Sequence, residues 1–427
     1  MRKIEKRNVF FYLSGKLVSL LGTKMFTFAM GLYILRITGS GMSFAFSLLL
    51  SMVPSLIFGP IAGSFADRFD RKKIVVWMDA LSGVSMLAAL WFANTQGLSI
   101  AIIYIAIVVL NALNIFFDVT FEASLPNLVE RKNLGVMQSY SHSIRNFTDI
   151  LGPVLGGLVY SLVDPKTFML INGISFLLSA ASEAFISFEF NRDETIKDNQ
   201  VPLSFSSVFN DLKEGYEYFS EKKEILSLYK HVMIYNFFFT AWDVLMPLIL
   251  VATLRVSDHS YGMVQGSFFA GALVFSLIGA RRMGAFQIRR FTGQMLLIAS
   301  MILLYALPVL PHPFPFFVNH VVPIYIGLGF VVGGVLMMIN IPMMVMIQMG
   351  TEDRYRGRVM GFCATISRVI SPLGLLIHGI LSDRVAPYIL MIYGGVAMLL
   401  VAIMFYRSSM KQNYYASIPQ EKEAKTS

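Results

Sequence analysis

Charged side chains are scarce in this chain. Aspartate, glutamate, lysine and arginine make up 14% of its 427 residues, against roughly 25% in an ordinary soluble domain, and 56% of the residues are hydrophobic. A soluble fold of this size could not bury so much apolar surface. The composition therefore excludes a water-soluble globular protein and favours an integral membrane protein.

Cysteine and catalytic motifs are also nearly absent. Cys363 is the only cysteine, so the chain cannot form an internal disulfide. We find no phosphate-binding loop, metal-ligand constellation or nucleophile triad in a plausible setting. We therefore expect no enzyme activity, no cofactor and no metal site. The net charge of +9 lies in short clusters between apolar runs, which indicates membrane orientation and no nucleic-acid partner.

Long apolar runs are what the sequence contains instead. A spanning helix needs about 20 mostly apolar residues. Twelve such runs lie at 9–37, 42–66, 74–94, 98–122, 134–163, 167–190, 226–254, 258–281, 291–311, 319–347, 358–382 and 385–407. The first run is too long for a cleavable signal peptide and lacks a small-residue cleavage site. The pattern predicts an all-α integral membrane protein of twelve transmembrane helices.

One long polar stretch divides these runs into six and six. We predict four regions: an N-terminal six-helix half at 1–190, a cytoplasmic linker with an amphipathic helix at 191–225, a C-terminal six-helix half at 226–407, and a polar cytoplasmic tail at 408–427. A short repeat supports the division. The start of the fifth run contains Gly135-Val-Met137, followed after seven residues by Arg145. The start of the eleventh run contains Arg358-Val-Met360, followed in the same way after seven residues by Arg368.

Lysine and arginine predict the orientation. If the N-terminus is cytoplasmic, the segments on that side hold 26 of the 35 basic residues, and the outer loops hold four. Basic residues concentrate on the cytoplasmic side of membrane proteins. We therefore expect a multi-pass protein of the cell (inner, cytoplasmic) membrane, with the lipid bilayer as its partner and both termini in the cytoplasm.

The loop Gly63-Ser-Phe-Ala-Asp-Arg-Phe-Asp-Arg-Lys-Lys73 lies between the second and third runs. Gly63 permits close helix contact, Asp67 can cap or pair at a helix end, and the basic residues hold the loop in the cytoplasm. The loop matches the signature G-x-x-x-D-R-x-x-R-K, and with it the chain resembles the major facilitator superfamily. The resemblance implies the major facilitator fold and a gating role for Gly63, Asp67, Arg68 and Arg71.

Three further stretches resemble the macrolide-efflux branch of that superfamily, which includes drug:proton antiporters. They are Leu125-Pro-Asn-Leu-Val-Glu-Arg131, Gly152-Pro-Val-Leu-Gly-Gly157 and Arg356-Gly-Arg-Val-Met-Gly361. The second stretch resembles the core of the antiporter motif, which implies export. The alternative is tight helix packing alone, because small residues let helices approach and Pro153 supplies a bend. On either interpretation the residues of a packing motif are Gly152, Pro153, Gly156 and Gly157. Many drug:proton antiporters carry an arginine in the fourth helix, but this chain has none there and carries Asn111, Asn114, Asp118 and Glu122 instead.

Charges within the apolar runs are the candidates for proton coupling or substrate binding. Each costs at least about 2.5–3.5 kcal/mol at the bilayer centre, so it is expected to face a cavity or a partner. The candidates are Asp149, Arg145, Arg368, Asp118, Glu122, Asp243 and Lys24. Arg145 and Asp149 are four positions apart near mid-depth and could pair. Lys16 and Glu183 lie near helix ends, which favours a structural role. For each carboxylate the alternatives are a proton carrier and an ion pair or helix cap.

These observations lead to one functional prediction and two alternatives. The prediction is a proton-coupled exporter of amphiphilic or lipophilic compounds, acting as a monomer by alternating access, with protons and a small amphiphilic substrate as its partners. The first alternative is a flippase or exporter of an anionic lipid or anionic metabolite, suggested by Lys24, Arg145 and Arg368. The second is a non-transporting membrane sensor, against which charges in both halves argue.

Overall fold

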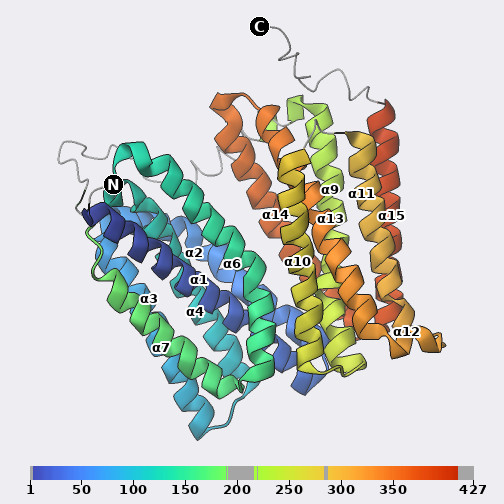
Figure 1. Ribbon diagram of the computed structural model, residues 1–427, viewed down its shortest axis with the longest axis horizontal. Helices are drawn as coiled ribbons and strands as arrows, with labels where there is room; N and C mark the ends of the chain where they lie inside the picture. The colour runs from blue at the N-terminus through green and yellow to red at the C-terminus, as the bar shows by residue number, and fades with distance from the viewer. Residues whose placement is uncertain (1–2, 189, 191–215, 219, 283–286, 412–427) are drawn as a thin grey trace. The chain divides into compact units, whose positions relative to one another are not determined.

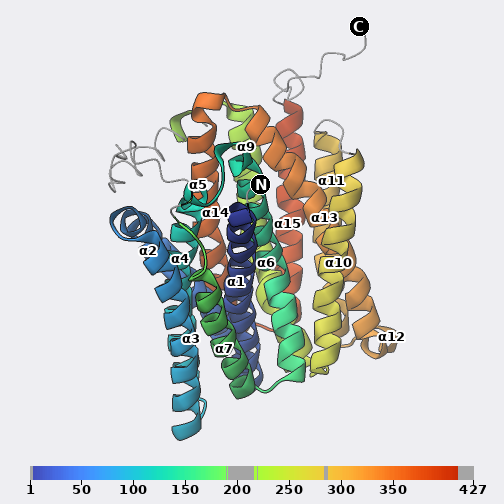
Figure 2. The ribbon, with the colours of Figure 1, turned by 60° about the vertical axis from the view of Figure 1, so that its left-hand side comes forward.

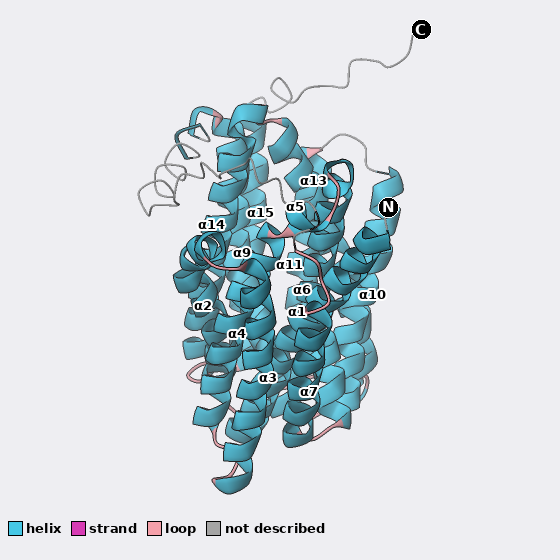
Figure 3. Cartoon of the chain, turned by 90° about the vertical axis from the view of Figure 1, so that its left-hand side faces the viewer, coloured by secondary structure: helices cyan, strands magenta, loops and turns pink. Residues whose placement is uncertain are grey.

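A computed structural model of the chain describes residues 3–188, 190, 216–218, 220–282 and 287–411. Within these residues every regular element is a helix, and no strand is present (Figure 3). The contacts within the chain define two compact units. Unit 1 comprises Met1–Thr38 and Phe46–Phe205, and unit 2 comprises Gly39–Ala45 and Ser206–Ser427.

The elements of the first part of the chain end at Glu183 (Figure 1). They are α1 (Lys3–Thr38), α2 (Gly41–Arg68), α3 (Arg71–Thr95), α4 (Ile100–Ala123), α5 (Leu125–Leu128), the 3₁₀-helix η1 (Arg131–Asn133), α6 (Leu134–Leu162) and α7 (Pro165–Glu183). The first turn of α2 belongs to unit 2, where the Ser40 hydroxyl and the Met42 amide donate to the Asp383 carboxylate at 2.5 and 3.2 Å.

The second part of the chain is equally helical. It contains α9 (Lys223–Pro247), the π-helix η2 (Leu248–Thr253), α10 (Asp258–Arg282), α11 (Ile288–Tyr305), the 3₁₀-helix η3 (Leu307–Val309), α12 (Pro315–Asn319), α13 (Val321–Met349), α14 (Asp353–Ser382) and α15 (Pro387–Lys411). Most of the predicted linker and tail lies outside the described residues, so the amphipathic helix expected in 191–225 stays a prediction.

Each of the twelve predicted apolar runs coincides with a helix. Among the described helices, nine are both long and apolar enough to cross a membrane. The other three, α6, α7 and α10, contain 29, 19 and 25 residues. The predicted all-α membrane fold is confirmed, and the structure is consistent with twelve spanning helices.

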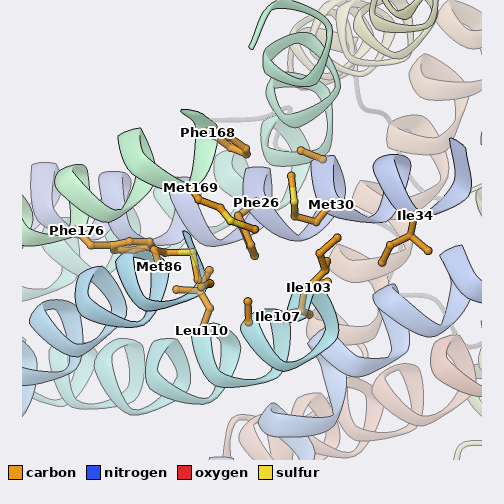
Figure 4. Close-up of a cluster of buried hydrophobic side chains, with 13 residues drawn as sticks. Phe26, Met30, Ile34, Met86, Ile103, Ile107, Leu110, Phe168, Met169 and Phe176 are labelled. Atoms are coloured by element: carbon orange, nitrogen blue, oxygen red, sulfur yellow. The ribbon is translucent and has the colours of Figure 1, made fainter. Parts of the chain in front are cut away.

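Apolar side chains from four helices form a core in unit 1 (Figure 4). Phe26, Met30 and Ile34 come from α1, Met86 from α3, Ile103, Ile107 and Leu110 from α4, and Phe168, Met169 and Phe176 from α7. This core fixes α3, α4 and α7 around α1, the helix that carries Lys16 and Lys24.

Glycines bring the backbones of neighbouring helices together. Helices α3 and α7 lie side by side in Figures 1 and 2, and a Cβ added at Gly83 would lie 2.8 Å from the Gly173 carbonyl oxygen. Helix α6 packs along α1 in the same way, because a Cβ at Gly156 would lie 2.7 Å from the Met25 carbonyl oxygen. This close approach places the charges of α6 within reach of α1.

Candidate coupling site

Four charged side chains from three helices form a network in unit 1, called the buried network here after its fully buried centre, Lys16; Glu122 and Arg145 at its edge are partly exposed. Lys16 of α1 reaches Glu122 and Asp118 of α4 at 2.5 and 3.1 Å, and its ammonium group also donates to the Ser141 hydroxyl of α6 at 2.6 Å. Arg145 of α6 lies 2.7 Å from the Asp118 carboxylate and 3.4 Å from the Glu122 carboxylate. The Lys16 side chain is fully buried and that of Asp118 is 5% exposed. Two cations and two anions therefore balance each other in this network.

A second ion pair joins helices α1 and α6, which both contribute to the buried network. The Lys24 ammonium group lies 2.8 Å from the Asp149 carboxylate, and the two side chains are 44% and 48% exposed. Gly152, one turn beyond Asp149, lies directly against the Lys24 side chain, where a Cβ would collide. The glycine of the predicted packing motif thus lets α6 approach closely enough for the pair to form.

Arg145 and Asp149, which could pair along α6, form ion pairs with other partners in the structure. Arg145 turns to the two carboxylates of α4, and Asp149 turns to Lys24 of α1. The i,i+4 spacing permits contact along one helix, but buried opposite charges on neighbouring helices compete successfully for both groups. Lys16, for which the sequence favoured a structural role near a helix end, lies at the centre of the buried network.

Helix α6 carries an exposed polar face. Gln138, His142 and Asp149 are exposed and Arg145 is partly so, and their spacing of four, three and four residues places them on one side of the helix. Asp149 lies about 22 Å along α6 from its first residue, near the middle of the helix. Lipid chains cannot solvate such a face, so it is suited to a water-filled or protein-lined path.

The remaining charged candidates lie in unit 2. Asp243 of α9 is partly buried, and within the described residues it takes part in no ion pair or side-chain hydrogen bond. Arg368 lies on α14, and its side chain is outside the described part of the structure. Their roles stay predictions.

The predicted gating loop ties three helix ends together. Arg71, the first residue of α3, lies 3.4 Å from Asp67 near the end of α2. It also donates to the carbonyl oxygens of Ala66 at 3.1 Å and of Ala123, the last residue of α4, at 2.8 Å. Of the two roles predicted for Asp67, the structure shows the ion pair, with Arg71. The N-cap of α3 is Asp70, whose carboxylate accepts a hydrogen bond from the Lys73 amide. Gly63 lies within α2, and Arg68, its last residue, is exposed. Gating stays a prediction for these residues.

Sequence reasoning missed one buried acid. Asp79 of α3 is 1% exposed and lies beside Glu183 of α7, which is fully buried. The signal was available, because Asp79 is the one acidic residue in the apolar run 74–94. Within the described residues no cluster of three or more His, Cys, Asp or Glu side chains is placed to hold a metal ion.

The long apolar helices are those of a multi-pass membrane protein, and the family and relatives that the chain matches are transporters of the major facilitator type. The model of the family described as transmembrane secretion effector matches residues 6–425, and the chain belongs to that family. The chain is therefore a transporter and not an enzyme, and it is a multi-pass protein of the cell membrane.

Relatives with named activities are distant but match over nearly the whole chain. Macrolide efflux protein A of Streptococcus pyogenes is 22% identical over 396 residues, which are 92% of this chain and 93% of that protein. Multidrug efflux pump Tap of Mycolicibacterium fortuitum is 24% identical over 379 residues, which are 87% and 88% of the two chains. A solved bacterial homologue of the human lysosomal transporter Spinster superimposes with a TM-score of 0.66 at 10% identity, covering 99% of this chain and all of that one. This last likeness concerns the fold alone.

Proposed function

We propose that the chain is a proton-coupled exporter of amphiphilic or lipophilic compounds that works as a monomer by alternating access. The observation that carries the proposal is the exposed polar face of α6, with the Lys24–Asp149 pair near its middle. The efflux activities named for two distant relatives support the direction of transport and the class of cargo.

The Lys24–Asp149 pair has the chemistry that coupling needs. A carboxylate in an antiporter must exchange a proton, and it must do so where water and cargo reach it. Nearly half of each side chain in this pair is exposed, so protonation of Asp149 leaves Lys24 in contact with water. In the buried network, protonation of Asp118 or Glu122 would leave the buried Lys16 short of a counter-charge. We therefore assign coupling to Asp149, with Lys24 as its counter-ion, and a scaffolding role to the buried network.

The proposal includes the membrane orientation. With both termini in the cytoplasm, the loop of Asp67 and Arg71 lies on the cytoplasmic side and can act there as the gate. Because α1 and α6 each cross the membrane once, their shared ion pair then lies between the two surfaces. An anionic cargo is less favoured, because Lys24 and Arg145 are each neutralised by carboxylates.

Reconstitution into liposomes tests the proposal. With an acidic lumen and the cytoplasmic face outward, we expect the protein to accumulate a cationic lipophilic dye inside, and we expect a protonophore to abolish the accumulation. Protein-free liposomes provide the control. Movement of labelled anionic lipid between leaflets with no dye accumulation would overturn the drug-export assignment, and the absence of both activities would favour a non-transporting protein.

A further inference from the structure

Two carboxyl groups meet in the interior of unit 1, away from the coupling site. Asp79 of α3 is 1% exposed and Glu183 of α7 is fully buried, and the two groups lie within hydrogen-bonding reach of each other. The Ser19 hydroxyl of α1 donates to Asp79 at 2.5 Å, and the Ser179 hydroxyl donates to Glu183 at 3.2 Å. A Cβ added at Gly15 of α1 would lie 2.6 Å from the Glu183 carboxyl, so this glycine leaves room for it.

No cation neutralises this pair within the described residues. Lys16 of α1 lies one turn from Ser19, but its ammonium group is bound to Asp118 and Glu122, and Lys24 is bound to Asp149. The remaining cations on the surrounding helices lie in the first two turns or the last turn of their helices: Lys3, Lys6, Arg7 and Arg36 of α1, Arg71, Lys72 and Lys73 of α3, and Lys166 of α7. The Glu183 Oε2 atom is buried without a hydrogen-bond partner.

Physical chemistry does not allow both groups to stay ionised. Two like charges within hydrogen-bonding reach of each other repel strongly in a protein interior, where little water screens them. Glu183 is also the last residue of α7, where the negative end of the helix dipole disfavours an anion. A proton shared between two acids removes the repulsion and provides the missing partner of Oε2.

We propose that Asp79 and Glu183 form a binding site for one proton, held on Glu183 Oε2 and donated toward the Asp79 carboxylate. Binding forms one O–H bond with a proton taken from water and changes the charge of the pair from −2 to −1. The remaining charge stays on Asp79, which accepts from Ser19. Because α1, α3 and α7 all contribute, loss of the proton would place two anions between three packed helices and would loosen their contact.

Infrared spectroscopy of the full-length protein in lipid nanodiscs tests the site without any cargo or pH gradient. Its outcome is therefore independent of the proposed export. At pH 7 we expect a carbonyl stretching band of a protonated carboxyl group that Glu183→Gln removes and that Asp79→Asn retains. The matched control is Asp164→Asn, because Asp164 is an exposed carboxylate and its replacement should leave the band unchanged.

Two further measurements keep the proposal falsifiable. Gly15→Ala retains both acids but displaces the Glu183 carboxyl, so it should shift the band even if Glu183→Gln fails to fold. A band that is unaffected by both variants would overturn the proposal. Stabilisation of the wild-type protein by Na⁺ but not by choline, lost in Glu183→Gln, would also overturn it, because the oxygen cluster would then bind a metal cation.

Discussion

At the scale of single residues, unit 1 contains ion pairs with very different access to water. Lys16 is fully buried among two carboxylates and a serine hydroxyl, whereas Lys24 and Asp149 are each nearly half exposed. Removal of a buried cation leaves its anions without a counter-charge and costs much stability. In an exposed pair, water replaces the lost partner, so the cost in stability is small. The first arrangement suits a scaffold and the second suits a group that changes its charge.

Lys16 and Lys24 of α1 allow this difference to be measured by the same change, lysine to methionine, at each position. Lys16→Met leaves Asp118 and Glu122 with Arg145 as their only cation, and we expect it to lower the free energy of unfolding by about 3 kcal/mol. Lys24→Met is the matched control and should lower it by about 1 kcal/mol or less. Thermal unfolding of the two purified variants checks this, and equal losses would contradict the assignment of a buried scaffold.

Asp164 gives a prediction about pH. It is the N-cap of α7: the Thr167 hydroxyl and the Thr167 and Lys166 amides donate to its carboxylate and lower its pKa. A lowered pKa in the folded state means that the stabilisation is present above the unfolded value, near 3.9, and is lost as the pH falls through the folded value.

We therefore expect Asp164→Ala to destabilise the protein at neutral pH by about 1 kcal/mol, with the deficit shrinking in acid. Asp164→Asn keeps an acceptor oxygen without titrating, so its stability relative to the alanine variant should not depend on pH. Thermal unfolding of both variants at a series of pH values checks this. A deficit of the alanine variant that grows in acid would contradict it.

At the scale of helices, the close approach of α1 and α6 positions the coupling pair. Gly152 faces Lys24 and Gly156 faces Met25. The same contact between α1 and α6 therefore contains the two glycines and the Lys24–Asp149 ion pair. A Cβ at Gly156 would meet the Met25 carbonyl oxygen and Cα, at 2.7 and 3.1 Å, and a backbone cannot turn aside as a flexible side chain can.

Gly156→Ala should therefore separate the two helices. We expect a loss of about 1–3 kcal/mol in unfolding free energy from overpacking, together with weaker coupled transport. Gly135→Ala, in the first turn of the same helix, has no atom within 4 Å of the added Cβ and should be neutral. Thermal unfolding of both variants and dye accumulation in liposomes check the prediction, and a fully stable, active Gly156→Ala protein would exclude this role for the contact.

The helices themselves could be predicted from sequence, because each spanning run is a local property of about 20 residues. The partners of the charged residues could not. Arg145 has a carboxylate four positions away on its own helix, yet it pairs with Asp118 and Glu122 of α4. Asp79 and Glu183 come from different helices, and only the packing of α3 against α7 brings them together. Pair spacing along a helix is visible in the sequence, whereas contact between helices depends on the folded bundle.

At the scale of the whole molecule, the proposed orientation in the membrane, with both termini in the cytoplasm, rests on the distribution of basic residues and can be tested directly. In a Cys363→Ser background, Arg384→Cys in the loop before α15 should react with a membrane-impermeant maleimide on intact cells. Lys132→Cys, exposed before α6, should react only after permeabilisation. The reverse pattern would place both termini outside.

The central claim is that Asp149 couples protons to export, and uphill transport in liposomes with an imposed pH gradient tests it most directly. We predict that Asp149→Asn fails to accumulate the dye against its gradient yet still equilibrates it downhill, because the pathway remains while the proton-binding group is gone. Asp164→Asn, which removes a carboxylate outside the coupling site, should accumulate dye like the wild-type protein. Uphill accumulation by Asp149→Asn at the wild-type level would contradict the claim.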